Sequence, residues 1–156
     1  MKYRALYQEH HKRQILMKAG IKMSIRYTSN LEGITKEALQ ELFLSVEWES
    51  GKYPNELLQA IKGSHSIVAT WDGDKLIGIS NALSDGVFTV YFHYMLINPS
   101  YQGKGIGKKM MDTMLDRYKG CKTKVLISYQ SAMDFYHKCG FSKEDGAMPM
   151  FISELV

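Results

Sequence analysis

The sequence predicts a mixed α/β domain in which helices cover both faces of a mainly antiparallel sheet of six to seven strands. Three β-prone segments follow one another between residues 66 and 97, separated by the turn signals Asp72-Gly73-Asp74 and Asp85-Gly86, which favour hairpins and antiparallel pairing. Beyond Pro99, helical and β-prone segments alternate, as is typical of crossover connections. The 156-residue chain is 45% hydrophobic and 23% charged, as expected for one globular domain.

The N-terminal third is predicted to hold an extension, a first strand and two helices. Residues 1–22 are rich in Lys, Arg, His and Gln, and we expect them to form a helical extension to a single domain at 23–156. The first strand of that domain begins at Met23. Thr35 is a favourable N-cap for a helix with apolar residues at helical spacing, and Pro54 begins a second helix, since proline suits the first helical turn.

The rest of the chain is predicted to supply the remaining strands and two further helices. The strand that ends at Ile97 is rich in Val, Tyr and Phe, and the helix after the glycine-rich loop is amphipathic. The elements expected after residue 65 are strands at 66–71, 75–82 and 87–97, a glycine-rich loop at 101–107 with its helix, a strand at 124–129, a helix at 131–139, and one or two strands within 141–155.

Charge, cysteine content and hydropathy exclude several classes of protein. A net charge of +4 suits an anionic ligand but is too small to indicate nucleic-acid binding. Cys121 and Cys139 lack the spacing of a metal site, and we expect them to be reduced thiols in a cytoplasmic protein. No stretch reaches the roughly 18 consecutive apolar residues of a membrane span. We therefore expect no metal, no nucleic acid and no membrane partner, and either a monomer or a homodimer.

The clearest functional feature is the loop from Gln102 to Lys108, QGKGIGK, which lies between a predicted strand and a predicted helix. Glycine at every second position lets backbone N–H groups point in one direction without obstruction by Cβ atoms. The start of the following helix adds unpaired N–H groups and a partial positive charge, which suits a pyrophosphate. The spacing excludes a dinucleotide-binding fingerprint and a Walker A loop. A turn without a ligand is the alternative interpretation.

Two stretches together resemble the GNAT (GCN5-related N-acetyltransferase) superfamily. Residues 97–107, INPSYQGKGIG, resemble its acetyl-CoA motif, Q/R-x-x-G-x-G/A after a strand end and a proline. Residues 132–141, AMDFYHKCGF, resemble its second motif, A-x-x-F-Y-x-x-x-G-F. The motifs stand in the family's order, and the resemblance covers residues 23–156. Residues 84–86 and the loop resemble the branch of arylalkylamine and aminosugar acetyltransferases, although that branch often carries an acidic residue where this chain has Tyr94.

This resemblance implies a site for acetyl-CoA and a general acid. Backbone N–H groups of the loop would bind the pyrophosphate, and the backbone of the central strand would pair with the pantetheine arm where the sheet is splayed. Tyr136 would lie at the thioester sulfur and protonate the leaving thiolate; core packing is its alternative role. The residues expected to bind acetyl-CoA are Met95, Leu96, Ile97, Gln102, Gly103, Lys104, Gly105, Ile106, Gly107 and Lys108.

The acceptor side is less well defined by the sequence. His93 lies in the central strand and titrates near neutrality, so it is a candidate base, although an isolated histidine in a strand is often a bystander. Glu47 and Glu49 stand at the end of the first helix, where they would either hold a cationic amine or form a solvated helix end. The aromatic residues that would wall an acceptor pocket, or else pack in the core, are Trp48, Tyr91 and Tyr94.

We therefore expect an acetyl-CoA-dependent N-acyltransferase that moves an acetyl group to a primary amine by direct attack, with a small amine or an aminosugar as acceptor. Three alternatives stay open. The chain would otherwise be a GNAT-fold module that binds CoA without catalysis, an enzyme that acetylates protein amines, or a nucleic-acid-associated protein that uses the basic residues 1–22.

Overall fold

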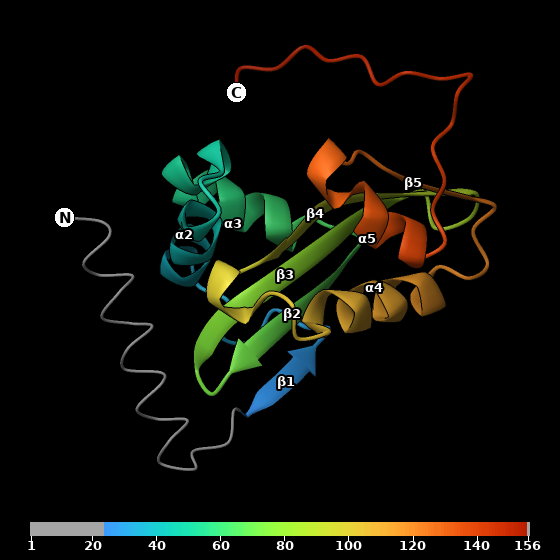
Figure 1. The fold of residues 1–156 in the computed structure, drawn as a ribbon. Coiled ribbons are helices and arrows are strands. Elements are labelled where there is room, and N and C mark those ends of the chain that lie inside the picture. Colours follow the sequence, from blue (N-terminus) through green and yellow to red (C-terminus); the bar gives the residue numbers. More distant parts are fainter. Residues whose placement is uncertain (1–23, 156) are drawn as a thin grey trace.

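A central sheet organises residues 24–155, the part of the chain that the structure, a computed structural model, describes. Its five strands are β1 (Ile25–Thr28), β2 (Ser66–Asp72), β3 (Lys75–Ser84), β4 (Thr89–Ile97) and β5 (Thr123–Leu126), which lie side by side in chain order (Figure 1). Pairing is antiparallel from β1 to β4 and parallel between β4 and β5, which a helical crossover connects. The helix predicted at 1–22 lies outside the described residues and stays a prediction.

Two pairs of helices cover the two faces of this sheet. One face carries α2 (Lys36–Ser45) and α3 (Pro54–Lys62), and the other carries α4 (Ile106–Arg117) and α5 (Met133–Lys138). Each pair encloses its own apolar core, so the predicted mixed fold with helices on both faces is confirmed. The fully or almost fully buried helix residues of the two cores are Leu39, Leu42, Phe43, Leu57 and Ile61 on the first face and Ile106, Met110, Met111 and Met114 on the second.

Helix starts follow the local sequence signals. The Oγ1 atom of Thr35 accepts a hydrogen bond from the N–H of Ala38 at 3.1 Å, which satisfies one of the free donors of the first turn of α2. Pro54 is the first residue of α3, where its missing N–H costs nothing. Both helices therefore begin where the sequence predicts.

A β-bulge in the middle of β4 decides which side chains face which helices. The pairing of β3 with β4 shifts between Ser80 and Ala82, and the Oδ1 atom of the buried Asn81 accepts a hydrogen bond from the N–H of Tyr94 at 2.7 Å. Side chains alternate along a regular strand, so an extra residue reverses the alternation beyond it. Consequently Tyr94 packs in the core under α2 and α3, whereas Met95 packs beside α4.

β4 and β5 separate at one end of the sheet. Their last paired residues are Phe92 and Leu126, and β4 continues to Ile97 without β5 beside it. The outer edge of β4 is therefore free of strand pairing from His93 onward among the described residues, which leaves backbone groups available to a ligand. The predicted splay of the sheet is present at this point.

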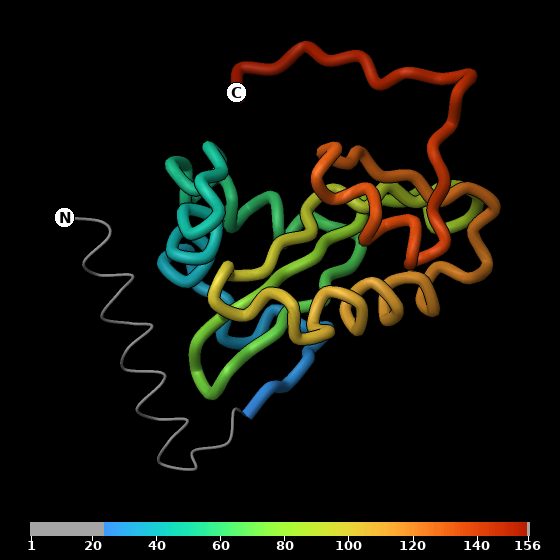
Figure 2. The backbone as a smooth tube through the Cα atoms, in the orientation of Figure 1, coloured from blue at the N-terminus to red at the C-terminus, as the bar shows by residue number. Residues whose placement is uncertain are grey.

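The predicted count of six to seven strands is wrong, because the described residues after Gly140 form no strand. The segment 147–152 is apolar enough to be a strand, but a strand exists only where a neighbouring strand pairs with its backbone. In the structure this segment runs away from the sheet instead (Figure 2). The sheet therefore ends at β5 with five strands.

Candidate functional site

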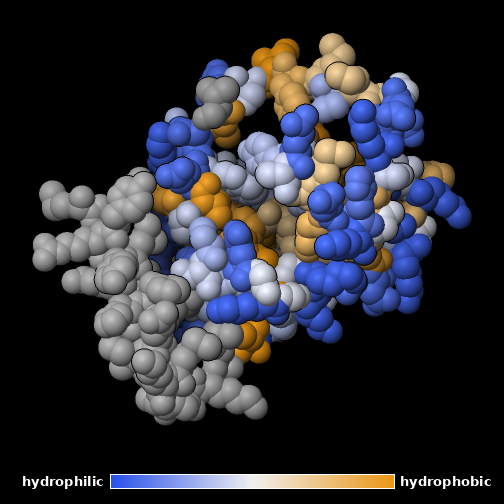
Figure 3. Space-filling view, viewed as in Figure 1, coloured by the Kyte–Doolittle hydropathy of each residue, from blue (hydrophilic) through white to orange (hydrophobic). Residues whose placement is uncertain are grey.

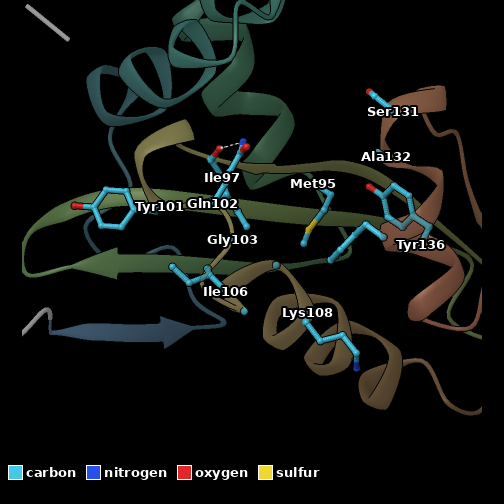
Figure 4. A pocket seen from close by; sticks show the side chains of 13 residues that line it. Met95, Ile97, Tyr101, Gln102, Gly103, Ile106, Lys108, Ser131, Ala132 and Tyr136 are labelled. Carbon is cyan, nitrogen blue, oxygen red and sulfur yellow. Dashed lines mark hydrogen bonds between the residues drawn. The ribbon is translucent and has the colours of Figure 1, made fainter. Parts of the chain in front are cut away.

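A pocket of about 530 Å³ opens where β4 continues beyond β5. One wall is the free part of β4, a second is the glycine-rich loop with the start of α4, and the third is α5 with the turn before it (Figure 4). Most of the residues expected at the donor site thus meet around one cavity. The residues that line it are Met95, Ile97, Tyr101, Gln102, Gly103, Gly105, Ile106, Gly107, Lys108, Ser131, Ala132, Phe135 and Tyr136.

Two residues expected at the donor site do not contribute side chains to the pocket. The Leu96 side chain is 4% exposed and packs in the core under α2 and α3, so only its backbone is available at the free edge of β4. Lys104 donates from Nζ to the carbonyl of Ser100 and lies over the ring of Tyr101. The structure thus places Lys104 at the rim of the loop rather than in the cavity.

The backbone of the loop requires glycine at two positions. Gly103 and Gly105 adopt left-handed conformations, with φ of 74° and 77°, which residues with a Cβ atom rarely adopt. A Cβ atom on either glycine would meet no protein atom within 4 Å, so the space beside them is open. By contrast, a Cβ atom on Gly107 would lie 3.0 Å from Cδ1 of Ile97, so glycine there permits close packing of α4 on β4.

The N-terminus of α4 faces the pocket with its first donors available. Gly105 is the N-cap residue, and no side chain of the described chain caps the helix. Lys109 is the first residue of the helix whose N–H donates a hydrogen bond to an earlier carbonyl, that of Gly105 at 3.1 Å. The N–H groups of Ile106, Gly107 and Lys108 therefore form a cluster of donors with a partial positive charge, which favours an anion.

Hydrogen bonds to neighbouring strands hold the loop in place. The Tyr101 hydroxyl, which is buried, donates to Oδ2 of Asp72 at 2.8 Å at the end of β2. Gln102 donates from Nε2 to the carbonyl of Ile97 at 3.1 Å (Figure 4). Lys108 pairs with Asp112 on the next turn of α4, and this hydrogen bond raises the pKa of Lys108. The loop is therefore positioned before any ligand binds.

Tyr136 projects from α5 across the pocket toward Met95 on β4 (Figure 4). Burial raises the pKa of its hydroxyl to about 12, because the charged phenolate is poorly solvated there. The hydroxyl is therefore protonated at neutral pH and available as a hydrogen-bond donor. The ring also contacts Phe135 and Phe141, so packing and donation are compatible roles for this side chain.

The aromatic residues expected on the acceptor side meet on the opposite face of β4. The Tyr94 ring contacts the rings of Phe43, Trp48 and His93 at centroid distances of 4.9, 5.8 and 4.1 Å. Tyr91 continues the row, with its hydroxyl 3.3 Å from Nδ1 of His93. Partial burial lowers the pKa of His93 below its ordinary value, so the imidazole is largely neutral at pH 7 and able to accept a proton.

A second pocket of about 310 Å³ lies beside Tyr94 on this face, with Ser50, Tyr53, Glu56, Leu57, Ala60, Glu154 and Leu155 as its other lining residues. Its carboxylates are Glu56 and Glu154, not the predicted pair. Glu49 forms an ion pair with Lys52 at 2.6 Å, and Glu47 stands exposed at a left-handed corner with φ of 61°. The structure therefore does not bring Glu47 and Glu49 to the pocket beside Tyr94.

Sequence reasoning missed Asn81, Ser50 and Glu56. Asn81 supports the bulge in β4, and its Nδ2 atom donates to Oγ of Ser64 at 2.8 Å. Ser50 lies 2.9 Å from the Tyr94 hydroxyl and fixes that ring. No sequence motif marks these contacts, because each joins residues at least 13 positions apart.

Asn81→Ala should lower the free energy of unfolding by about 1–3 kcal/mol, because the N–H of the half-buried Tyr94 loses its acceptor. Denaturation in urea measures this loss. The control is Asn30→Ala, which removes the same amide from an exposed turn where Asn30 accepts from the N–H of Glu32. Equal losses in the two variants would show that Asn81 does not support the bulge.

Residues 24–155 lack both a membrane-spanning helix and a cluster of metal-binding side chains. No helix there is long and apolar enough to cross a membrane. No group of three or more His, Cys, Asp or Glu side chains in that range is arranged to hold a metal ion.

Comparison with known proteins adds independent observations. Residues 32–141 match the model of the Acetyltransferase (GNAT) family. The chain is 31% identical over 133 residues to the uncharacterised N-acetyltransferase ycf52 of Porphyra purpurea. This alignment covers 80% of this chain and 75% of that protein. The chain is also 33% identical over 99 residues to the histone acetyltransferase TAP1 of Glycine max. This alignment covers 60% of this chain and 42% of that protein.

A solved structure shares the fold. The GNAT-family acetyltransferase of Streptococcus pneumoniae superposes with a TM-score of 0.72 at 25% sequence identity, over 83% of this chain and 98% of that one. The matched family region contains β2 to β5, the glycine-rich loop and α5, and so includes every wall of the larger pocket.

Proposed function

Because the chain belongs to the GNAT acetyltransferase family, we propose that it transfers the acetyl group of acetyl-CoA to a primary amine. The observation that carries this proposal is the pocket of about 530 Å³ between the free edge of β4, the uncapped start of α4 and Tyr136. It combines an anion site, an unpaired strand edge and a hydrogen-bond donor, as a pyrophosphate, an amide-containing arm and a thioester require.

The residues of the pocket fit acetyl-CoA as co-substrate. The open space beside Gly103 and Gly105 admits a phosphate group close to the backbone, where a Cβ atom would stand in its way. N–H groups at the start of α4 would donate to the pyrophosphate, and Lys108 adds a positive charge at the cavity wall. The backbone of Met95 to Ile97 would pair with the amide groups of the pantetheine arm.

Three groups of this chain are the candidates to assist the chemistry, and His93, the first of them, lies next to Tyr94 without lining either pocket. When bound, acetyl-CoA supplies an activated acyl group with a thiolate as the leaving group. An alkyl amine has a pKa near 10.4 and arrives mostly protonated, so a base must accept a proton from it, directly or through water. His93, neutral near pH 7, is the candidate for that role. A backbone N–H at the free edge of β4 would polarise the carbonyl, and the Tyr136 hydroxyl would donate to the sulfur.

The acceptor would approach from the opposite face of β4. Tyr94 and Met95 are consecutive residues that face the smaller and the larger pocket respectively, and the free edge of β4 separates the two cavities. The smaller pocket of about 310 Å³ combines aromatic walls with carboxylates, which suits a small cationic amine more than a folded protein surface. Acetylation of a protein amine is the second candidate, since a relative bears the name histone acetyltransferase.

An acetyl-transfer screen tests the proposed function. Release of CoA from acetyl-CoA is followed with aromatic amines, aminosugars, polyamines and a lysine-containing peptide as separate acceptors. We expect turnover with at least one small amine and little with the peptide. Tight acetyl-CoA binding without turnover on any acceptor would instead indicate a CoA-binding module without catalysis.

The pH dependence of the reaction tests His93. The base form of the imidazole persists below pH 6.5, because the pKa of His93 is lowered, and it is lost as the pH falls further. We expect the single-turnover rate at saturating amine to decline in that acidic range, and His93→Gln to slow the reaction and remove this inflection. His65→Gln is the control, because His65 bonds Tyr118 of the core under α4, whereas the row of aromatic rings lies on the other face of the sheet. An unchanged acidic limb in His93→Gln would exclude His93 as the base.

A further inference from the structure

Asp72, the last residue of β2, joins two parts of the chain through the two oxygens of its carboxylate. Oδ2 accepts a hydrogen bond from the hydroxyl of Tyr101 at 2.8 Å, and Oδ1 accepts a second from the N–H of Ser24 at 3.2 Å. The two donors lie 29 and 48 positions away from Asp72 in the sequence. One carboxylate therefore connects the glycine-rich loop, which follows Tyr101, with the residue that leads into β1.

Tyr101 forms the loop end of this connection. It is the last residue of the 3₁₀ helix η2 (Pro99–Tyr101), and the next two residues, Gln102 and Gly103, line the larger pocket. The Tyr101 ring is 3% exposed and packs in the core under α4, with its hydroxyl turned away from the other labelled residues (Figure 4). A buried hydroxyl needs a partner, because leaving it unsatisfied costs free energy. Asp72 supplies that partner and so fixes the ring and the residues after it.

Ser24 forms the other end. It precedes β1, the four-residue edge strand of the described sheet, in which Ile25 is opposite Asp72 in register. The carbonyl of Ser24 also accepts a hydrogen bond from the N–H of Gly73 at 3.4 Å. A short edge strand opens more easily than the centre of a sheet, since few contacts hold it. The start of β1 thus depends on both the backbone and the side chain of Asp72.

Charge attraction does not explain a carboxylate at this position. The outer surface of α4 is largely hydrophilic (Figure 3), and Lys108 at its start lines the larger pocket with a positive charge. Asp72 does not line that pocket, and its negative charge would repel a pyrophosphate rather than attract it. A contribution of Asp72 to acetyl-CoA binding would therefore come from the position that it imposes on Tyr101 and the loop.

We infer that Asp72 is a positioning residue for the larger pocket and that it couples this pocket to the start of β1. The inference rests on the proposed acetyl-CoA site. Because each oxygen of the carboxylate holds one donor, order at Tyr101 favours order at Ser24, and the reverse. Coupling between two sites is reciprocal, since both share one difference in free energy. Acetyl-CoA bound to the loop therefore stabilises the Ser24 hydrogen bond, and loss of the Asp72 carboxylate weakens acetyl-CoA binding.

Titration calorimetry and steady-state kinetics with Asp72→Ala test the loop end. We expect the Kd and the KM for acetyl-CoA to rise roughly 3- to 10-fold, in the range of one hydrogen bond, while kcat stays unchanged. Asp74→Ala is the matched control, because it removes an exposed carboxylate from the turn that follows Asp72. Thermal melts establish that both variants are folded. A folded Asp72→Ala protein with unchanged acetyl-CoA affinity would overturn the inference.

A double-mutant cycle shows whether Asp72 acts through Tyr101. Tyr101→Phe removes the other partner of the same hydrogen bond, so the double variant should bind acetyl-CoA no more weakly than the weaker single variant. Losses of affinity that add up in the double variant would mean that the two residues act independently, contrary to the inference.

Hydrogen exchange tests the β1 end. In the unchanged chain we expect saturating acetyl-CoA to slow exchange of the Ser24 amide, and we expect Tyr101→Phe to abolish this protection at equal occupancy by acetyl-CoA. The amide of Glu32 is the control, because it bonds Asn30 in an exposed turn and should exchange at the same rate with and without acetyl-CoA. Exchange at Ser24 that does not respond to bound acetyl-CoA would refute the inference alone, whereas failure of the unchanged chain to bind acetyl-CoA would refute the proposed function as well.

Discussion

Replacing Gly105 with Val should weaken acetyl-CoA binding by roughly 10- to 100-fold while the protein remains folded. The added side chain would occupy the open space beside the loop and displace a phosphate from one or two backbone donors. A hydrogen bond to a charged group contributes about 1.5–3 kcal/mol, and about 1.4 kcal/mol corresponds to a factor of ten in affinity. Titration calorimetry with acetyl-CoA measures the change.

The control for this experiment is Gly86→Val, because backbone strain alone must be separated from the loss of the ligand site. Gly86 has φ of 76°, against 77° for Gly105, and lies in the turn before β4, at the opposite end of that strand from the loop. Both substitutions force a β-branched residue into a left-handed conformation and cost about 1–3 kcal/mol of stability. Only Gly105→Val should lower affinity. If a folded Gly105→Val protein binds acetyl-CoA normally, the loop is a turn without a ligand.

The larger pocket could be predicted because its determinants are close together in the sequence. Positions 102 to 108 carry both the glycines that allow the turn and the first residues of the helix that provides donors. Tyr136 and its neighbours lie on one short helix at a recognisable spacing. Such local patterns fix backbone conformation directly, so the structure assembles the pocket from the residues that the sequence indicates.

The orientation of β4 could not be predicted in the same way. Whether Met95 or Tyr94 faces α4 depends on the bulge, and the bulge depends on Asn81 from the preceding strand. A strand without the bulge would point Met95 away from the larger pocket, because side chains alternate with a period of two. The carboxylates beside Tyr94 could not be predicted either, because Glu56 reaches the smaller pocket from α3, whereas Glu47 and Glu49 do not line it.

The strands predicted within 141–155 rest on apolar sequence alone, which is not sufficient to form a strand. The segment 148–152 has the apolar character of a strand, but it forms a strand only where a neighbouring backbone pairs with it. Within one chain the structure leaves the segment exposed and ends the sheet at β5.

Tyr136→Phe should lower the rate of the chemical step by about 10²-fold and leave the affinity for acetyl-CoA nearly unchanged. Only one oxygen is removed, so the ring still packs against Phe135 and Phe141. General acid catalysis typically contributes roughly 10²–10⁴-fold. We expect the lower end, because a thiolate with a pKa near 8.5 leaves without full protonation, and a hydroxyl with a pKa of about 12 gives up its proton reluctantly.

Single-turnover measurement is needed for this comparison, because slow product release would hide a change in the chemical step. The pKa of about 12 also means that Tyr136 stays protonated through pH 10, so its ionisation should cause no alkaline loss of activity in that range. Tyr101→Phe is the matched control: it removes the hydroxyl of another tyrosine that lines the pocket, but this hydroxyl bonds Asp72 and holds the loop. That variant should lose stability or acetyl-CoA affinity rather than the chemical rate. A Tyr136→Phe enzyme with the unchanged single-turnover rate would remove Tyr136 from the mechanism, and the donor site would stand, because it depends on the separate glycine-rich loop.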